Sequence, residues 1–567
     1  MAAQAPAYNN GRPTEKSGHF YLGGKRTSLL GFDNDMRNHP PAHRNRPDRL
    51  LYARQMRLEN KPHGSVRRSL SFAALLLAAS CSSAGDGIPS LRTVSGTFKT
   101  TYWLDDGTKT TVNSPPPNGQ TVKAILVPTG TTAGYTTIPI TLDSNQSFTL
   151  SNVPAGPYFL QLDAPRFPIC QGCPGGNFHE EVVFTQLIEL RADSPDLTFL
   201  SAARPDVVHT GRFIHLEVSG LAPWVSGDSV VTASSQAAHY GRFSPSPTPS
   251  AGSTAAGGTL GLFDGLPDAS KHDVFYVYQR STTTVGNGSS VGTVAAASRF
   301  ARLTDLTITQ TTSSVSLTLT DSAPQTGAVA ADIRYSQFAA LAPLVHPTAV
   351  PSVFGAFVSV PAVPHSLEYP DKPSPFERTT LFFLSNVPAP TTDVNYATLH
   401  YGEFLDPLWK TFRSVAYLFD AQVPSVEGGG SIISSVPIPA EPGPIVPVLG
   451  PPTQPRIAGR DAFADQNGVG LQPVITWSPP TLGHPTSYQI TITRHTQPVI
   501  AGETRTISAI VYSSRTFKLP PGFMKQGSQY TATISARSGP WDTFDHAPFR
   551  EGIPFHTADC LTGVFTP

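Results

Sequence analysis

The sequence predicts an all-β, multi-domain chain built as an array of β-sandwich modules. Short runs rich in Val, Ile, Thr, Phe and Tyr, such as 212–218 and 273–279, alternate with clusters of turn residues. Pro (56) and Gly (47) make up about 18% of the 567 residues, against about 12% in average proteins. No heptad repeat or long amphipathic helix interrupts this pattern. Strands of this kind usually bury one face and show the other to water.

The length of 567 residues suggests three to five domains. Residues 1–55 are basic, polar and aperiodic, and Met56 is well placed as the true start of translation. Along the chain we expect a disordered extension or misassigned start (1–55), a signal peptide (56–80), a tether (81–92), a first β-sandwich (93–195), two β-rich domains (196–330 and 331–436), a Pro-rich linker (437–453) and a last β-sandwich (454–558).

The net charge of zero hides an asymmetry between the two ends of the chain. Residues 1–80 carry 13 basic and 5 acidic residues, and the remainder carries 27 basic and 35 acidic ones. The body is therefore mildly acidic and has no basic stripe, which argues against nucleic-acid binding.

Residues 61–81 (KPHGSVRRSLSFAALLLAASC) have the pattern of a secretory signal. The apolar run of about ten residues is too short to cross a bilayer core of about 30 Å. The segment 77–81 (LAASC) resembles the lipobox of bacterial lipoproteins, in which the signal is cleaved before a Cys whose sulfur receives a diacylglycerol. This resemblance implies lipidation of Cys81, and Ser82 resembles the outer-membrane sorting pattern. The alternative is a buried apolar helix with a chance Cys.

The first sandwich contains the runs 95–98 (SGTF) and 147–158 (SFTLSNVPAGPY). Pro154 and Gly156 permit a turn between two strands. These runs resemble the carboxypeptidase regulatory-like (transthyretin-like) β-sandwich family, a non-catalytic accessory fold. The resemblance implies that Phe148 and Tyr158 pack inward.

The last sandwich resembles a fibronectin type III domain, one of the immunoglobulin-like sandwiches. The matching runs are 474–480 (VITWSPP), 487–492 (SYQITI), 516–520 (TFKLP) and 529–536 (QYTATISA). The resemblance implies that Trp477, Tyr488, Leu519 and Tyr530 are core residues. It further implies that the hydroxyl of Tyr530 bonds to backbone as a tyrosine corner.

Residues 437–455 hold eight prolines in nineteen positions. Such a stretch favours polyproline II at about 3.1 Å per residue, so it could separate two bodies by roughly 60 Å. We therefore expect the last sandwich to be held away from the rest of the chain.

Two local motifs carry candidate chemistry. Residues 288–292 (GSSVG) match G-x-S-x-G, which in a nucleophile elbow needs a strand before and a helix after; a hairpin loop is the alternative that we favour. Cys170 and Cys173 form a C-x-x-C pair followed by His179. Outside the cytoplasm a local disulfide is favoured over a zinc site or a redox motif, and it leaves Cys560 either free or pairing between molecules.

These observations favour an envelope lipoprotein that acts as a binding or structural module and is not an enzyme. It would be anchored to the membrane by lipid, on the outer membrane, and would bind an envelope protein or a polysaccharide. We expect no catalytic residues, no metal and no cofactor. The alternative is an envelope hydrolase with its site in 196–440, whose sandwich modules are accessories.

Overall fold

The computed structural model confirms the predicted all-β class, and the few helices that it describes are short. Among the described residues no helix has the length and apolar character that crossing a membrane would require. The structure describes residues 90–567 except 105–106, 117–119, 130–133, 164–166, 169–180, 202, 208–211, 238, 263–264, 288–290, 360–379, 391, 407–412, 425–428, 439–442, 496–504, 513, 540–546 and 550–553.

The first module is a β-sandwich of two sheets. β1 pairs with β2, β5 and β9, while β3 pairs with β4 and β6, and β8 pairs with β6 and β7. Phe148 and Tyr158 are buried in the core of this module, as the family resemblance implies. β9 lies beyond the predicted boundary at residue 195 and still belongs to the module. The strands are β1 (Leu91–Trp103), β2 (Lys109–Asn113), β3 (Thr121–Pro128), β4 (Tyr135–Pro139), β5 (Ser147–Pro154), β6 (Tyr158–Asp163), β7 (Phe167–Pro168), β8 (Glu181–Leu190) and β9 (Leu197–Ser201).

The second module has a separate core that contains Trp224. Its strands follow each other by backbone pairing in the order β16, β10, β13, β12, β11, β14 and β15. The elements are β10 (Arg212–Ser219), β11 (Ser229–Ser234), β12 (His239–Pro245), β13 (Ala255–Leu262), the 3-10 helix η3 (Ala269–Lys271), β14 (Phe275–Val285), β15 (Gly292–Leu303) and β16 (Ser314–Thr318).

We call this series of strands joined by backbone pairing the ladder. The third region continues it, because β20 pairs with β15 on one side and with β19 on the other. β19 then pairs with β22, and β22 with β23, whereas β18 and β21 form a separate two-stranded sheet. The elements are β17 (Asp321–Ser322), β18 (Gly327–Ile333), α1 (Tyr335–Ala339), α2 (Ala342–Val345), β19 (Val350–Ser359), β20 (Thr380–Asn386), β21 (Val394–Tyr401), β22 (Ser414–Gln422) and β23 (Gly429–Pro437).

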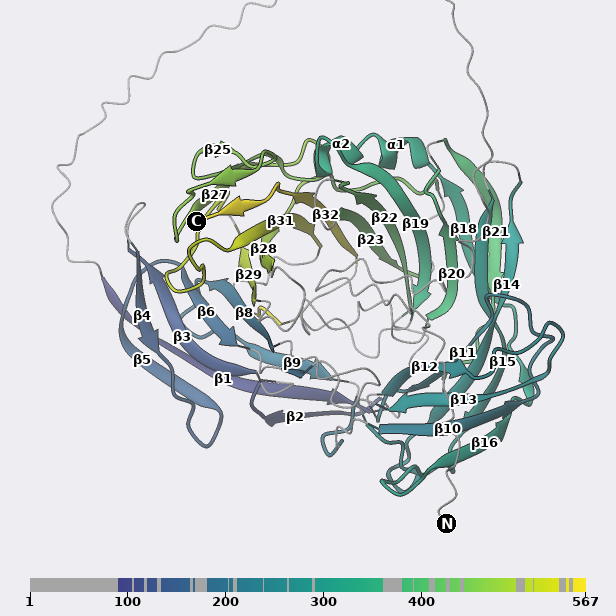
Figure 1. Ribbon diagram of the computed structural model, residues 1–567. Coiled ribbons are helices and arrows are strands. Elements are labelled where there is room, and N and C mark those ends of the chain that lie inside the picture. The colour runs from purple at the N-terminus through teal and green to yellow at the C-terminus, as the bar shows by residue number, and fades with distance from the viewer. Residues whose placement is uncertain are drawn as a thin grey trace, which may run out of the picture. The chain divides into compact units, whose positions relative to one another are not determined.

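The last module is a sandwich of the kind that the fibronectin resemblance implies. β24 pairs with β25 and β27, and β27 with β30, while β28 lies between β29 and β31, and β32 follows β31 (Figure 1). The strands are β24 (Thr453–Ile457), β25 (Arg460–Asp461), β26 (Gln466–Asn467), β27 (Val474–Ser478), β28 (Ser487–His495), β29 (Arg505–Val511), β30 (Thr516–Lys518), β31 (Gln529–Ser538), β32 (Phe555–Leu561) and β33 (Phe565–Thr566).

Both edges of the fibronectin-like sheet are covered by strands of other modules. β29 pairs in parallel with β8 of the first module, and β32 pairs antiparallel with β23 of the third region. Together with the pairing of β15 with β20, these contacts join all four regions through backbone hydrogen bonds. The ladder therefore runs from β4 to β16 through strands of every module.

The Pro-rich segment corrects the expectation of a spacer. Ile445 is buried and forms a parallel bridge with Ile333, and Leu449 is buried in the same large core cluster. Ile445 thus packs onto the third region, and the backbone N–H of Gly450 donates to the carbonyl of Leu482 of the last module at 3.0 Å, so the segment lies against both. The paired strands β23 and β32 lie on either side of this segment in sequence, so the last sandwich is docked and not held at a distance.

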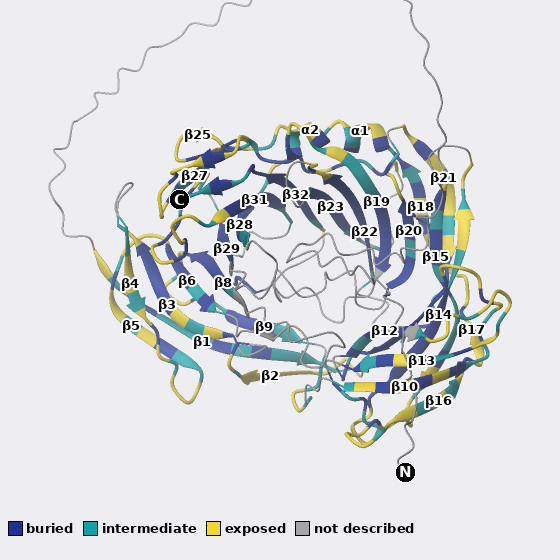
Figure 2. Cartoon of the chain, viewed as in Figure 1, coloured by how far each residue is buried: buried dark blue, intermediate teal, exposed yellow. Residues whose placement is uncertain are grey.

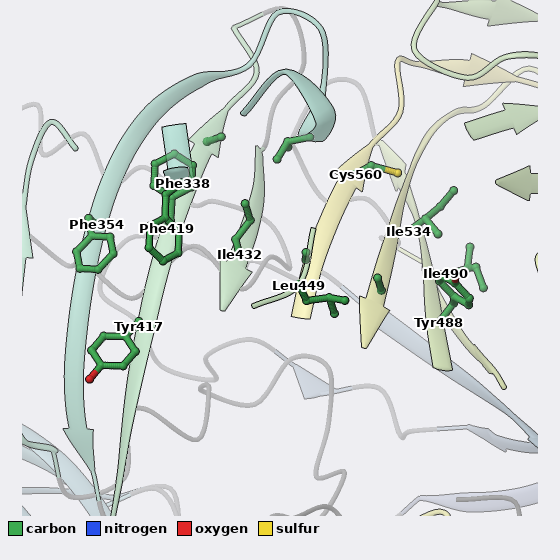
Figure 3. Packing of buried hydrophobic residues seen from close by; sticks show 14 of the residues in the cluster. Phe338, Phe354, Tyr417, Phe419, Ile432, Leu449, Tyr488, Ile490, Ile534 and Cys560 are labelled. Carbon is green, nitrogen blue, oxygen red and sulfur yellow. The ribbon is translucent and has the colours of Figure 1, made fainter. Parts of the chain in front are cut away.

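The third region and the fibronectin-like module share one hydrophobic cluster (Figure 3). The ring of Phe338 from α1 lies 5.5 Å from that of Phe354 and 5.8 Å from that of Phe419. Ile490 and Ile534 contribute to the same cluster from β28 and β31. Because the cluster is continuous, we treat the two regions as one packing unit.

Candidate functional site

All four predicted core residues of the last sandwich are buried. Trp477 and Tyr488 pack edge to face with ring centroids 5.2 Å apart, and Leu519 is fully buried. The backbone N–H of Lys525 donates to the hydroxyl of Tyr530 at 2.8 Å, which is the contact expected of a tyrosine corner. These residues hold the sandwich together and leave the opposite face of its sheet to carry other chemistry.

That opposite face, on β28, β29, β31 and β32, is lined mainly by polar side chains, and Ile510 and Leu561 are apolar positions on it. We call it the hydroxyl face: Ser487, Gln489, Thr493, Thr506, Ser508, Thr531, Ser535 and Thr557. The alternation predicts a face in contact with water, but its residues are only 0 to 8% exposed (Figure 2). The expectation of one solvent face is therefore wrong for this sheet. Alternation reports the polarity of a face, and polar faces can also be buried when hydrogen bonds satisfy them.

Hydrogen bonds satisfy part of the hydroxyl face. The amide of Gln489 donates to the hydroxyl of Ser508 at 2.8 Å. Within the described part of the chain, the hydroxyls of Ser487, Thr506 and Thr557 are buried and have no hydrogen-bond partner. A buried hydroxyl without a partner costs about 1–3 kcal/mol. These three hydroxyls therefore lower the stability of the folded chain.

A pair of buried carboxyl groups lies where the third region meets the fibronectin-like module. The hydroxyl of Ser431 on β23 donates to Asp420 on β22 at 2.7 Å, and its backbone N–H donates to Asp559 on β32 at 3.2 Å. Burial, and then the nearby charge of Asp559, raise the pKa of Asp420 to about 7, although the bond from Ser431 opposes the shift. Asp420 can therefore hold a proton close to neutral pH.

Sequence reasoning missed this carboxyl pair. Asp420 and Asp559 lie far apart in the chain and belong to no motif. The available signal was a lone carboxylate inside an otherwise apolar strand, in the run VAYLFDA at 415–421. A charge in such a strand is seldom buried without a partner.

Cys560 is a free thiol among the described residues and is fully buried in β32. Burial raises the pKa of its thiol, so the thiolate needed for oxidation is disfavoured. Of the two states left open by the sequence, the structure therefore favours the free thiol over pairing between molecules.

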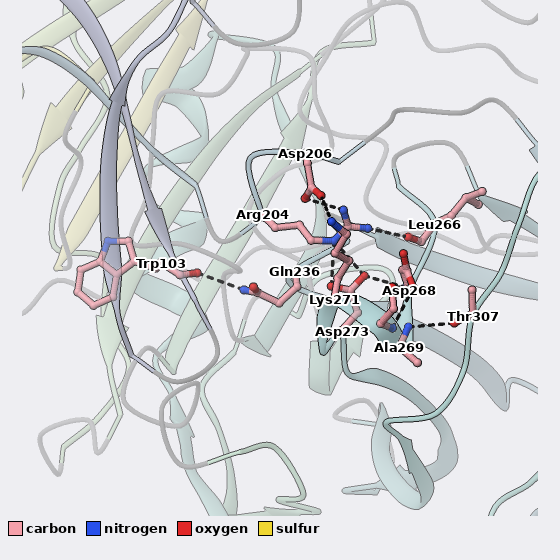
Figure 4. A network of polar contacts seen from close by, with 11 residues as sticks. Trp103, Arg204, Asp206, Gln236, Leu266, Asp268, Ala269, Lys271, Asp273 and Thr307 are labelled. Carbon is pink, nitrogen blue, oxygen red and sulfur yellow. Dashed lines mark hydrogen bonds and ion pairs between the residues drawn. The ribbon is translucent and has the colours of Figure 1, made fainter.

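A second polar network lies in the second module and reaches the first (Figure 4). The guanidinium of Arg204 bonds to the buried carboxylate of Asp273 at 3.0 Å and to Asp206 at 2.7 Å. Bonds from Arg204 and Lys271 hold the pKa of Asp206 down at about 2. Gln236 donates to the backbone carbonyl of Trp103 in β1 at 3.2 Å. The network fixes loops of the second module and ties them to the first.

The G-x-S-x-G segment occupies a hairpin connection. Residues 288–290 lie outside the described part of the chain, but β14 and β15 pair antiparallel on either side of it, from Val285 opposite Gly292. A strand follows the motif where a nucleophile elbow requires a helix. The flanking geometry is therefore that of the favoured hairpin loop.

Three predicted site residues lie outside the described residues: Cys81, Cys170 and Cys173. Lipidation and the local disulfide stay predictions.

No family model and no curated protein matches this chain. Among solved structures, the chain is similar to the FN1–FN3 domains of chicken CNTN1, with 9% sequence identity over 60% of this chain and 90% of that one. The TM-score is 0.12, too low for this likeness to add to the strand pairings described above.

Proposed function

We propose that this chain is a lipid-anchored binding and structural protein of the bacterial envelope, whose ligand is an envelope protein or a polysaccharide. The export signal and the Cys at 81 support the location. The fibronectin-like and transthyretin-like sandwiches support a binding or structural role.

The continuous backbone ladder is the observation that carries the proposal. Hydrogen-bonded strands join β8 to β29, β32 to β23 and β20 to β15, so the modules cannot turn freely about their linkers. A body of this kind presents its surfaces in fixed positions, and binding then costs little conformational entropy. This is what a scaffold in the envelope requires.

The anchor is tested with the variant Cys81→Ala. We expect the wild-type chain in the membrane fraction with an acylated Cys81 and no peptide from residues 56–80 in mass spectrometry. The variant should move to the soluble fraction, while the control Ser82→Ala should stay with the membrane. An intact peptide spanning 56–81 in the mature protein would contradict the anchor.

The ligand is tested by cross-linking on intact cells, followed by purification of the chain from envelopes. We expect one envelope protein or polysaccharide to be enriched over a mock purification. The same enrichment from an unrelated envelope lipoprotein of equal abundance would argue against a specific ligand.

A further inference from the structure

The ladder ends at β16, and this edge is open. The backbone N–H of His215 donates to the carbonyl of Ser313 at 2.8 Å, and that of Leu319 donates to Ser219 at 2.9 Å. Backbone groups alternate in direction along a strand, so those of Ser314, Ser316 and Thr318 point away from β10. β10 is the one strand that pairs with β16 in the part of the chain that the structure describes.

The β16 edge lacks the features that usually protect an edge strand from pairing. Residues 306–320 (LTITQTTSSVSLTLT) contain no charge, Pro or Gly. Two other edge strands differ, since β2 begins at Lys109 and β4 ends at Pro139. Ser314, Ser316 and Thr318 are exposed, and Val315 and Leu317 between them are half-buried against the core of the second module (Figure 2).

We propose that β16 pairs antiparallel with β16 of a second copy of this chain, around a two-fold axis at Ser316. In this register Ser314 lies opposite Thr318 of the partner, and Ser316 lies opposite its own copy. The backbone groups of these residues, which point away from β10, therefore meet those of the partner. The pairing would form about six backbone hydrogen bonds, because each such pair exchanges two.

The side chains match in the same register. Val315 lies opposite Leu317 of the partner, so the two half-buried apolar positions extend each other's core, and hydroxyl groups pair on the exposed face. Because one patch meets its own copy, the interface is closed and yields a dimer. The run 306–320 contains no titratable group, so dimerisation should depend little on salt.

The test uses the full chain with the Cys81→Ala change, to keep micelles out of the measurement. Sedimentation equilibrium should show a monomer–dimer equilibrium. Ser316→Lys and Ser316→Glu each place like charges together at the axis and should raise the dissociation constant by about tenfold or more. An equimolar mixture of the two variants should recover the dimer. A wild-type chain that stays monomeric, or variants that dimerise as it does, would overturn the proposal.

Cross-linking gives a second, independent readout. Residues of a hydrogen-bonded antiparallel pair have Cα atoms about 5.5 Å apart, within the range of a disulfide. Ser316→Cys should therefore form a covalent dimer on mild oxidation, and Ser314→Cys, which would not face itself, should not. Equal cross-linking of the two variants would refute the register.

Discussion

The fibronectin-like module and the second module are both built of strands and both pair with the third region, but of the two only the second module has an open ladder edge among the described strands. The fibronectin-like sheet has β8 on one edge and β23 on the other, and its core belongs to the cluster that includes Phe338 and Phe419 of the third region. The second module has a cluster of its own around Trp224 and ends the ladder at an open edge. On its other side, Tyr276 and Tyr278 belong to the shared cluster, and β15 pairs with β20 of the third region.

This difference shows that a domain recognised from sequence need not be a unit of stability. The fibronectin-like module is recognisable from its own strands, yet it shares backbone bonds and buried side chains with its neighbours. We therefore expect it to unfold together with the third region, whereas the part of the second module around Trp224 should open before β14 and β15 do.

The largest expected effect comes from two matched tryptophan variants. Trp477→Ala and Trp224→Ala each remove a buried indole and should cost about 3–5 kcal/mol of stability. In hydrogen–deuterium exchange, Trp477→Ala should raise exchange in β28 and β31 and also in β19 and β22. The change in Trp224→Ala should be largest in β10 and β13 and should not reach β28 or β31. If exchange in Trp477→Ala rose only within residues 453–567, the fibronectin-like module would unfold without the third region, and the comparison would be wrong.

The buried carboxyl pair at the junction of the third region and the fibronectin-like module predicts that stability depends on pH. Since the pKa of Asp420 is raised to about 7, the folded chain keeps a proton that the unfolded chain loses near pH 4. The contribution of Asp420 to stability should therefore be greatest below about pH 4, fall as the pH rises to about 7, and then level off.

Asp420→Asn removes the carboxyl group and should raise stability at pH 8 by an amount on the order of 3 kcal/mol. In thermal unfolding, the stability gained by this variant over wild type should grow as the pH rises from 4 to 7. Asp321→Asn, at an exposed position, should follow the wild-type curve. A difference in stability between wild type and Asp420→Asn that stays constant over this range would show that Asp420 is ionised throughout.

The smallest effect is expected at the tyrosine corner. Tyr530→Phe leaves the N–H of Lys525 without its acceptor and should cost about 1–2 kcal/mol. Tyr417→Phe in the shared cluster is a matched control and should change stability by less, since no hydrogen bond is described for its hydroxyl. Equal losses measured by urea unfolding would mean that the corner contact contributes nothing specific.

The residues that sequence reasoning placed correctly are those whose role is local. Trp477 and Tyr530 lie in short runs whose alternation and turns define one sandwich. The same local patterns predicted the strands around the hairpin at 285–292.

The errors concern contacts between distant segments. Prolines at 437–455 favour an extended chain in water. Burial of the Ile445 and Leu449 side chains lowers the free energy of the folded chain and favours the packed position instead. The pairing of β8 with β29 leaves no mark on side-chain patterns, because it is made by backbone groups that every residue has. For the same reason the pairing of Asp420 with Asp559 through Ser431 could not be seen in the sequence.

The parallel pairing of β8 with β29 has a consequence for the order of folding. Glu181–Leu190 is synthesised early, and its partner Arg505–Val511 comes near the end of the chain. Until that segment arrives, β8 has an unpaired edge that could join another nascent chain. Closing so long a loop is slow, because its entropy must be lost before the contact forms. The cell would therefore have to keep the chain from aggregating until residues 505–511 are available, and truncation before residue 505 should leave it prone to aggregation.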